Sequence, residues 1–136
     1  MVDPVINIVR SATAADTMTT DLAWIDGSAT VADAIKAMRL KKVSCLLVNR
    51  RSDEDAWGIV TRKDVVHKVV APGKSPHDVK VFEIMSKPLI TVPPCLTLKY
   101  CARLFHMTGI RRAPVFDGKE IIGILSNTDI FNAIYV

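Results

Sequence analysis

The sequence predicts an α/β protein made of two β-α-β-β-α repeats, and three observations lead to this fold class. The segment Gly58–Asp64 (GIVTRKD) recurs as Gly123–Asp129 (GILSNTD). A helical spacing of apolar residues precedes each copy, and short apolar runs typical of strands follow that predicted helix. A repeat of about 60 residues would be marginally stable alone. We therefore expect the two sheets to pack face to face with pseudo-twofold symmetry.

The duplication sets the domain organisation. Aligning Met18 with Met85 also places Thr30 against Thr97, and the turn-forming residues between the copies mark a linker. The predicted organisation is an N-terminal arm over 1–14, a first repeat over 15–71, a linker over 72–78 and a second repeat over 79–136.

One amphipathic helix is expected in each repeat. Thr30 and Thr97 stand one residue before the apolar pattern, where an N-cap belongs. Asp33 could complete a capping box in the first repeat, whereas Tyr100 stands at that position in the second. The buried quartets expected at the i, i+3, i+4, i+7 spacing are Val31, Ala34, Ile35 and Met38, and Leu98, Cys101, Ala102 and Phe105.

The remaining elements follow each helix in the same order. Two apolar runs separated by turn residues predict a hairpin in each repeat, and a second helix then ends the repeat. The predicted strands are Ala23–Ile25, Cys45–Val48 and Ala56–Val60, then Ile90–Val92, Ala113–Phe116 and Glu120–Leu125, with closing helices over Arg62–Val70 and Asn127–Tyr135.

The composition excludes several classes of protein. Apolar residues make up 49% and charged residues 24%, which is ordinary for a soluble globular protein. No apolar run is long enough to span a membrane and no secretory signal is visible, so we expect a cytoplasmic protein without a membrane partner. The net charge of +4 is spread along the chain rather than gathered in a basic patch, so we expect no nucleic-acid partner.

The sequence contains no motif for a metal site or for catalysis. The histidines lack ligand spacing, and the three cysteines form no C-x-x-C pair. Their apolar contexts predict buried free thiols in a reducing compartment. No Walker loop, zinc-protease motif or nucleophile elbow is present, so we expect neither a metal site nor an enzyme.

The duplicated segment has two interpretations. Thr61 with Asp64, and Ser126 with Asp129, have the spacing of a helix-capping box, which alone would explain each pair. The same geometry suits a ligand, because a helix N-terminus offers free amides and a carboxylate can accept both hydrogen bonds of a ribose diol. The glycine that opens each segment would permit a close approach to the strand.

These repeated elements resemble a tandem CBS-domain pair (a Bateman module) over residues 15–136. The resemblance rests on paired Met-[Thr/Ser] starts, on Pro114-Val115 after Ile110–Arg112, and on two Gly-x-x-[Thr/Ser]-x-x-Asp segments. It implies a disc-like pair with two clefts between the repeats. In the family these clefts commonly hold AMP, ADP, ATP or S-adenosylmethionine as a regulatory ligand, with no obligatory cofactor. It also implies that two such pairs associate into a homodimer.

The resemblance also implies roles for particular residues. Asp64 and Asp129 would bind ribose, with Thr61 and Ser126 near the ribose or phosphate. The residues implied for the adenine slot are Val43, Ser44, Cys45, Ile90, Ile110, Arg111, Arg112 and Ala113, with Ile25 nearby, although core packing explains Val43 and Ile110 equally well. The phosphate candidates are Arg62, Lys63, Arg111 and Arg112. Asn127 and Thr128 replace Arg62 and Lys63 in the second copy, so we expect unequal sites.

The resulting functional hypothesis is a regulatory or sensor module. An adenosine-containing ligand would favour one arrangement of the repeats and so act on a dimer or on a target protein that the sequence does not identify. The alternative is a ligand-free structural domain for dimerisation, in which both aspartates are only caps.

Overall fold

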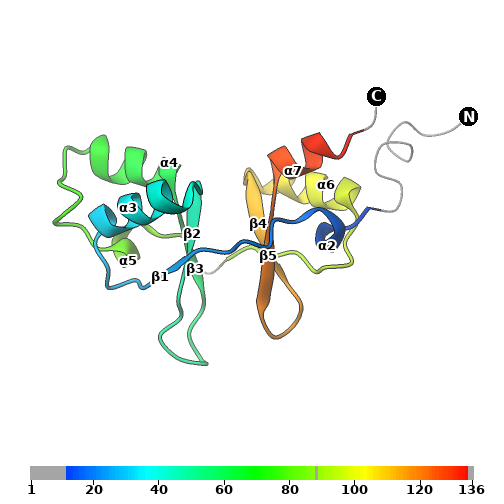
Figure 1. Ribbon diagram of the computed structural model, residues 1–136, viewed down its shortest axis with the longest axis horizontal. Helices are drawn as coiled ribbons and strands as arrows, with labels where there is room; N and C mark the ends of the chain where they lie inside the picture. The colour runs from blue at the N-terminus through cyan, green and yellow to red at the C-terminus, as the bar shows by residue number, and fades with distance from the viewer. Residues whose placement is uncertain (1–11, 88, 135–136) are drawn as a thin grey trace, which may run out of the picture. The chain divides into compact units, whose positions relative to one another are not determined.

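The computed structural model describes residues 12–87 and 89–134, which form two compact units (Figure 1). Unit 2 is the contiguous segment Leu22–Leu89, and unit 1 combines the residues up to Asp21 with those from Ile90 onward. Unit 2 contains β1 (Trp24–Ile25), α3 (Val31–Lys41), β2 (Cys45–Val48), β3 (Gly58–Thr61), α4 (Arg62–Val65), η1 (Val66–Val70) and α5 (Val81–Ile84). Unit 1 contains α2 (Ala14–Thr17), α6 (Leu98–Thr108), β4 (Arg112–Phe116), β5 (Ile121–Ser126) and α7 (Asn127–Asn132). The predicted α/β class is confirmed.

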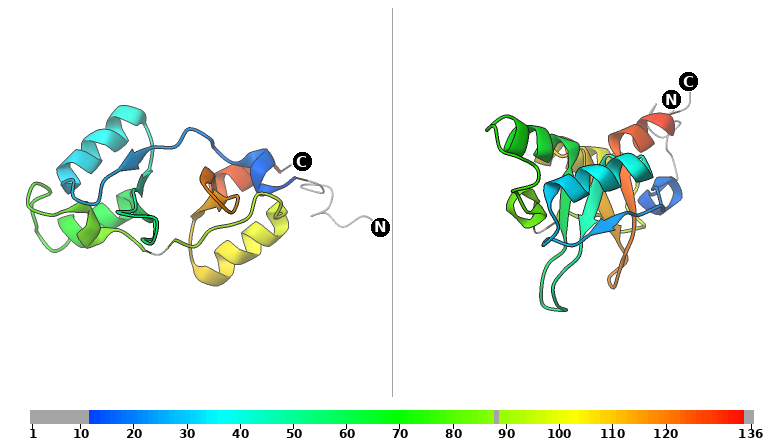
Figure 2. Two further views of the ribbon diagram at one scale, coloured as in Figure 1. Left: turned by 90° about the horizontal axis from the view of Figure 1, so that it is seen from below. Right: turned by 60° about the vertical axis from the view of Figure 1, so that its left-hand side comes forward.

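The two units exchange the opening segments of the two sequence repeats. In unit 1, Thr19 and Ile124 donate backbone hydrogen bonds to each other, both at 2.9 Å. In unit 2, Ile59 and Ser86 do the same, at 3.0 and 2.9 Å. The segment carrying α2 therefore lies beside β5, and the segment after α5 lies beside β3 (Figure 2). Each unit is thus built from both sequence repeats, which the duplication alone did not predict.

The arm predicted over residues 1–14 is only partly described. Residues 1–11 lie outside the described part of the chain. Ala12 packs against the core of unit 1 and Ala14 is fully buried in it. Ala14 also donates its backbone N–H to the Leu96 carbonyl at 2.8 Å. The last residues of the predicted arm therefore belong to unit 1.

The two sheets match strand for strand apart from one position. In unit 2, β1 pairs in parallel with β2, which pairs antiparallel with β3. In unit 1, β4 and β5 pair antiparallel, but only a bridge from Val92 to Val115 stands where β1 stands in unit 2. Leu47 N–H donates to the Ala23 carbonyl at 2.9 Å. Pro114 occupies the equivalent position and has no N–H, so the strand predicted over Ile90–Val92 is reduced to a bridge.

The helices begin and end largely as expected. Asp33 N–H donates to Thr30 Oγ1 at 3.1 Å and Thr30 N–H donates to Asp33 Oδ2 at 3.2 Å, which confirms the predicted capping box. Thr97 is the N-cap of α6 without a side-chain cap bond. Both helices end in the left-handed conformation, at Lys42 (φ 55°) and Gly109 (φ 71°). Glycine adopts this conformation without steric strain, whereas for lysine the side chain makes it less favourable.

Each unit has its own apolar core. Val31, Ala34 and Met38 of α3 are buried in unit 2, and Leu98, Cys101 and Phe105 of α6 are buried in unit 1. Ile35 is partly buried, as predicted, but Ala102 is exposed. Leu104 packs on the unit 1 core in place of Ala102, because that core lies nearer the Leu98–Cys101–Leu104 side of α6. The core thus lies on the predicted helix but slightly rotated about it.

The closing helices differ from the prediction in detail. The helix expected over Arg62–Val70 is present, with α4 continuing into the π-helical η1. The helix expected over Asn127–Tyr135 is α7, which ends at Asn132, and Tyr135 lies outside the described residues. All three cysteines are free; Cys45 and Cys101 are buried, whereas Cys95 is exposed, contrary to expectation. Burial raises the pKa of the Cys101 thiol to about 11.

The charged hairpin turn after β2 is not uniformly solvated. Residues 51–54 are exposed, but the Asp55 side chain is only 13% exposed. Its carboxylate forms an ion pair with Lys87 at 2.6 Å and accepts the Arg51 N–H at 2.9 Å. These contacts, led by that of Lys87, hold the pKa of Asp55 well below its ordinary value. The hairpin is thereby attached to the segment that follows α5 within unit 2.

Candidate functional site

The Thr61–Asp64 pair forms a complete capping box at the start of α4. Thr61 donates both its N–H and its hydroxyl to Asp64 Oδ2, at 2.9 and 3.1 Å. Asp64 N–H donates in return to Thr61 Oγ1 at 3.2 Å. The carboxylate is therefore held in one orientation, with 13% of the side chain exposed.

The second copy has the same geometry at the start of α7. Ser126 N–H donates to Asp129 Oδ2 at 2.9 Å, and Asp129 N–H donates to Ser126 Oγ at 3.1 Å. Asp129 is half-buried, as Asp64 is. The capping function predicted for both pairs is confirmed, and it leaves each carboxylate fixed at the end of a strand.

The two aspartates differ in one neighbour that the sequence analysis missed. Lys68 Nζ lies 3.1 Å from Asp64 Oδ1 and donates to the Ile84 carbonyl at 2.8 Å. Ala133 stands at the same distance along the chain from Asp129. Its methyl side chain can offer no charge. The i, i+4 spacing of Asp64 and Lys68 was the available sequence signal.

The glycines that open the two segments are approached closely, but by methionine side chains of the exchanged segments. A Cβ on Gly58 would lie 2.8 Å from Met85 Sδ and 3.3 Å from the Ser86 carbonyl oxygen. A Cβ on Gly123 would meet Met18 Sδ even more closely and would lie 3.0 Å from the Thr19 carbonyl oxygen. A close approach is thus present at both glycines, but the methionine of each Met-[Thr/Ser] start makes it and fills the space that the ligand interpretation had left open.

The strand entries predicted for the adenine slot lie beside the capped helices of their own unit. In unit 2, Arg62 N–H donates to the Ser44 carbonyl at 3.2 Å, and Cys45 pairs with Thr61. In unit 1, Asn127 N–H donates to the Arg111 carbonyl at 2.9 Å, and Arg112 pairs with Ser126. The predicted residues of the two strand entries thus form two equivalent groups, one beside the start of each capped helix.

Several side chains of these groups face the cores. Val43 packs on the core of unit 2 and Ile110 on that of unit 1, in line with the packing alternative. Cys45 and Ala113 are buried, so neither presents an exposed side chain to a ligand. Ile90 is 43% exposed and has no part in the hydrogen bonds of the strand entry.

The phosphate candidates are mostly exposed. Arg62, Lys63 and Arg111 are on the surface and Arg112 is half-buried. Arg62 Nη2 donates to the Val43 carbonyl at 3.5 Å, which holds its guanidinium beside the strand entry of unit 2. Polar Asn127 and Thr128 occupy the equivalent exposed positions in unit 1, whereas Arg111 and Arg112 stand where unit 2 has Ser44 and Cys45. The candidate cations therefore lie on the helix in unit 2 and on the strand entry in unit 1.

Residues 12–87 and 89–134 contain no cluster of three or more His, Cys, Asp or Glu side chains arranged to hold a metal ion. Within the same residues, no helix has the length and hydropathy needed to cross a membrane.

Comparison with known proteins decides the family. A family model for the CBS domain matches residues 14–71 and 81–136. The chain belongs to the CBS domain family. Both matches cover a capped Asp helix, so the duplicated segment occurs once in each CBS domain.

Several CBS proteins are similar over most of this chain. The hexameric CBS-CP12 protein from bloom-forming cyanobacteria is 50% identical, with a TM-score of 0.84, over 88% of this chain and 69% of that protein. The mitochondrial CBS domain-containing protein CBSX3 of Arabidopsis thaliana is 33% identical over 82% of this chain and 55% of its own length. An uncharacterized protein of Methanopyrus kandleri is 32% identical over 90% and 62%, respectively. The chain thus spans little more than half the length of these two curated relatives.

Proposed function

We propose that this CBS pair is a regulatory module that binds an adenosine-containing ligand through Asp64 and Asp129. Tandem CBS-domain proteins are regulatory modules, and this chain contains two CBS domains. The observation that carries the proposal is the repeated carboxylate, fixed by a capping box beside a strand entry in each unit. The clefts between repeats that the family resemblance implies remain a prediction.

The fixed carboxylates suit a ribose diol. Two vicinal hydroxyls can donate to one carboxylate, and an acceptor already held in one orientation loses little conformational entropy on binding. Capping and ribose binding are compatible, because a carboxylate has about four acceptor positions and the capping box uses only some of them.

The two groups hold their cations on different elements. Arg62 and Lys63 lie on the helix side of the Asp64 group, whereas Arg111 and Arg112 lie on the strand entry of the Asp129 group. AMP, ADP and ATP would gain from such cations, whereas S-adenosylmethionine carries no phosphate. We therefore propose that both groups favour phosphorylated ligands but differ in their phosphate preferences.

Transmission of the signal needs a second molecule or a second state. A ligand shifts an equilibrium only if it binds the two states with different affinity. We propose self-association, with a homodimer as the smallest assembly, together with an unidentified target protein. The hexameric assembly of the similar CBS-CP12 protein supports the self-association.

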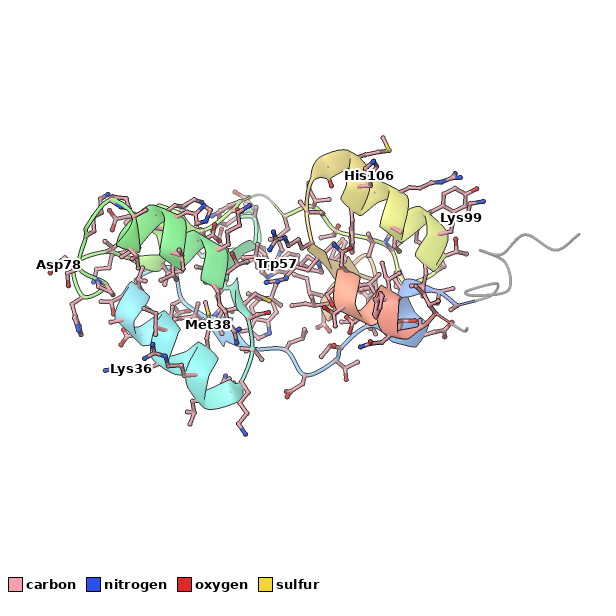
Figure 3. All side chains as sticks on the ribbon, turned by 90° about the horizontal axis from the view of Figure 1, so that it is seen from above. Lys36, Met38, Trp57, Asp78, Lys99 and His106 are labelled. Carbon is pink, nitrogen blue, oxygen red and sulfur yellow. The ribbon has the colours of Figure 1, made fainter. Side chains whose placement is uncertain are left out.

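The test is calorimetric titration of the full chain with AMP, ADP, ATP and S-adenosylmethionine. Asp129→Asn and Asp64→Asn each keep one oxygen for the cap but remove the second acceptor that a diol needs. We expect each to weaken binding at its own group about tenfold, the effect of losing a charge-assisted hydrogen bond. Asp78→Asn is the matched control, because Asp78 is exposed on the loop before α5 (Figure 3).

The outcomes separate two functions. Unchanged affinity in both Asn variants would reject the ribose role of the aspartates. If no ligand raises the thermal midpoint at any concentration, the ligand-free structural function replaces the proposal, because a ligand that binds the native state must stabilise it.

A further inference from the structure

We propose that Lys68 determines which aspartate binds ribose more tightly: it occupies the Asp64 carboxylate and leaves Asp129 as the stronger site. The proposal rests on the function proposed above and concerns the ribose contact alone. Lys68 Nζ makes two contacts at once, with Asp64 Oδ1 at 3.1 Å and with the Ile84 carbonyl at 2.8 Å.

The number of acceptor positions limits Asp64. A carboxylate offers about four acceptor positions, two on each oxygen. Thr61 N–H and the Thr61 hydroxyl both donate to Oδ2, and the Lys68 ammonium contacts Oδ1. A ribose diol needs two positions, so it can bind Asp64 bidentately only after Lys68 leaves.

Lys68 is held in place by more than its charge. Ile84 is the last residue of α5, where helix carbonyls lack partners within the helix. The ammonium donates to that carbonyl and so serves as a cap for α5. A diol that displaces Lys68 must therefore break an ion pair and uncap α5, although water can replace both contacts because the Lys68 side chain is 46% exposed.

The second copy lacks this competitor. Ala133 occupies the position of Lys68 relative to the aspartate, and an alanine cannot contact a carboxylate with a charge. In the capping box of this copy, Ser126 N–H donates to Asp129 Oδ2. The same diol would meet no ammonium from this position of the helix at Asp129.

Adenosine is the suitable probe, because it carries the diol but no phosphate that could bind Lys68 itself. In the full chain carrying Asp129→Asn, only the Asp64 site retains its carboxylate. Adding Lys68→Met removes the ammonium but keeps most of the aliphatic stem. We expect adenosine to bind about threefold more tightly, the size expected for removing a half-exposed ion pair. Lys36→Met is the matched control, because Lys36 loses the same charge from the exposed side of α3 (Figure 3).

The reciprocal experiment adds the competitor to the other copy. In the chain carrying Asp64→Asn, Ala133→Lys should weaken adenosine binding about threefold. Ala133→Met, which adds similar bulk without charge, controls for repacking, since Ala133 packs against the core of unit 1. Thermal unfolding of every variant verifies that it is folded.

Failure of the inference can be distinguished from failure of the proposed function. If either Asn substitution weakens adenosine binding but Lys68→Met leaves the affinity unchanged or lowers it, Lys68 does not compete and the inference is overturned. If adenosine binding to the full chain is independent of both aspartates, the proposed ribose sites are wrong, and the inference fails with them.

Discussion

Gly58 and Gly123 are required by what lies next to them rather than by their backbone conformation. The sulfur atoms of Met85 and Met18 occupy the space that a side chain at these positions would need. The sequence could predict that something approaches both glycines. It could not identify the methionines, because the contact depends on the exchange of segments between units.

Substitution of these glycines tests the exchange at single residues. Gly123→Ala should lower the free energy of unfolding by about 1–3 kcal/mol, the usual cost of overpacking. Gly58→Ala should cost less, because its nearest neighbour, at 2.8 Å, is the flexible end of Met85 and the backbone oxygen is farther away than at Gly123. Urea unfolding of both variants gives the comparison, and an equal cost would contradict it. Met18→Ala should recover part of the loss in the Gly123 variant, though not in the Gly58 variant.

At the scale of elements, α3 and α6 have the same length, the same left-handed end and a threonine N-cap, but the two N-caps differ in their hydrogen bonds. Thr30 accepts the Asp33 N–H in a capping box, whereas the Thr97 side chain makes no cap bond. Tyr100 stands where Asp33 stands in the first repeat and cannot complete the box. The two helices therefore offer a comparison of threonine N-caps within one molecule.

Alanine substitution should separate the two caps. Thr30→Ala is expected to destabilise the protein by about 1 kcal/mol, because it removes the acceptor of a first-turn amide. Thr97→Ala should change the free energy of unfolding by only a few tenths of a kcal/mol, roughly the effect of an ordinary surface substitution. Thermal or urea unfolding measures both, and a larger effect at Thr97 would show that the cap assignment is wrong.

The elements were largely predictable from the sequence and their partners were not. Helical spacing located α3 and α6, and the turn residues between apolar runs located both hairpins. Pro114 was an available sequence signal that the strand expected near Val92 would be short, because proline has no backbone N–H to donate to that strand. Likewise, the i, i+4 spacing of Asp64 and Lys68 is a sequence signal for their ion pair. The second contact of Lys68, with the Ile84 carbonyl, has no sequence signal and is visible only in the structure.

At the scale of the whole molecule, the family boundaries and the folded units divide the chain differently. The CBS model matches residues 14–71 and 81–136, whereas unit 2 runs from Leu22 to Leu89. Val79, Val81 and Ile84 belong to the core of unit 2. The duplication shows which stretches of the sequence are copies of each other. Which surfaces pack together depends on long-range contacts that a repeat pattern does not record.

Fragments should follow the folded units. A fragment of residues 22–89 is expected to unfold cooperatively on heating, because it keeps the complete unit 2 core. A fragment of residues 15–71 should show little tertiary structure, since it loses three buried core residues and the bridge from Ser86 to Ile59. Near-ultraviolet circular dichroism and amide exchange compare the two. Equal protection in both would show that the exchanged segment contributes nothing to unit 2.

The exchange also imposes an order on folding during synthesis. Unit 2 is contiguous and can form its core once Leu89 has left the ribosome. The segment with α2 emerges earlier, but its partner β5 is translated only after all of unit 2 and most of unit 1. Synthesis proceeds at about 5–20 residues per second, so translation of the roughly 70 residues of unit 2 alone takes several seconds. During this time Ala14 and Met18 have no unit 1 core to pack against. Ala14 and Met18 thus remain without their unit 1 core partners for longer than the buried residues of any helix in unit 2.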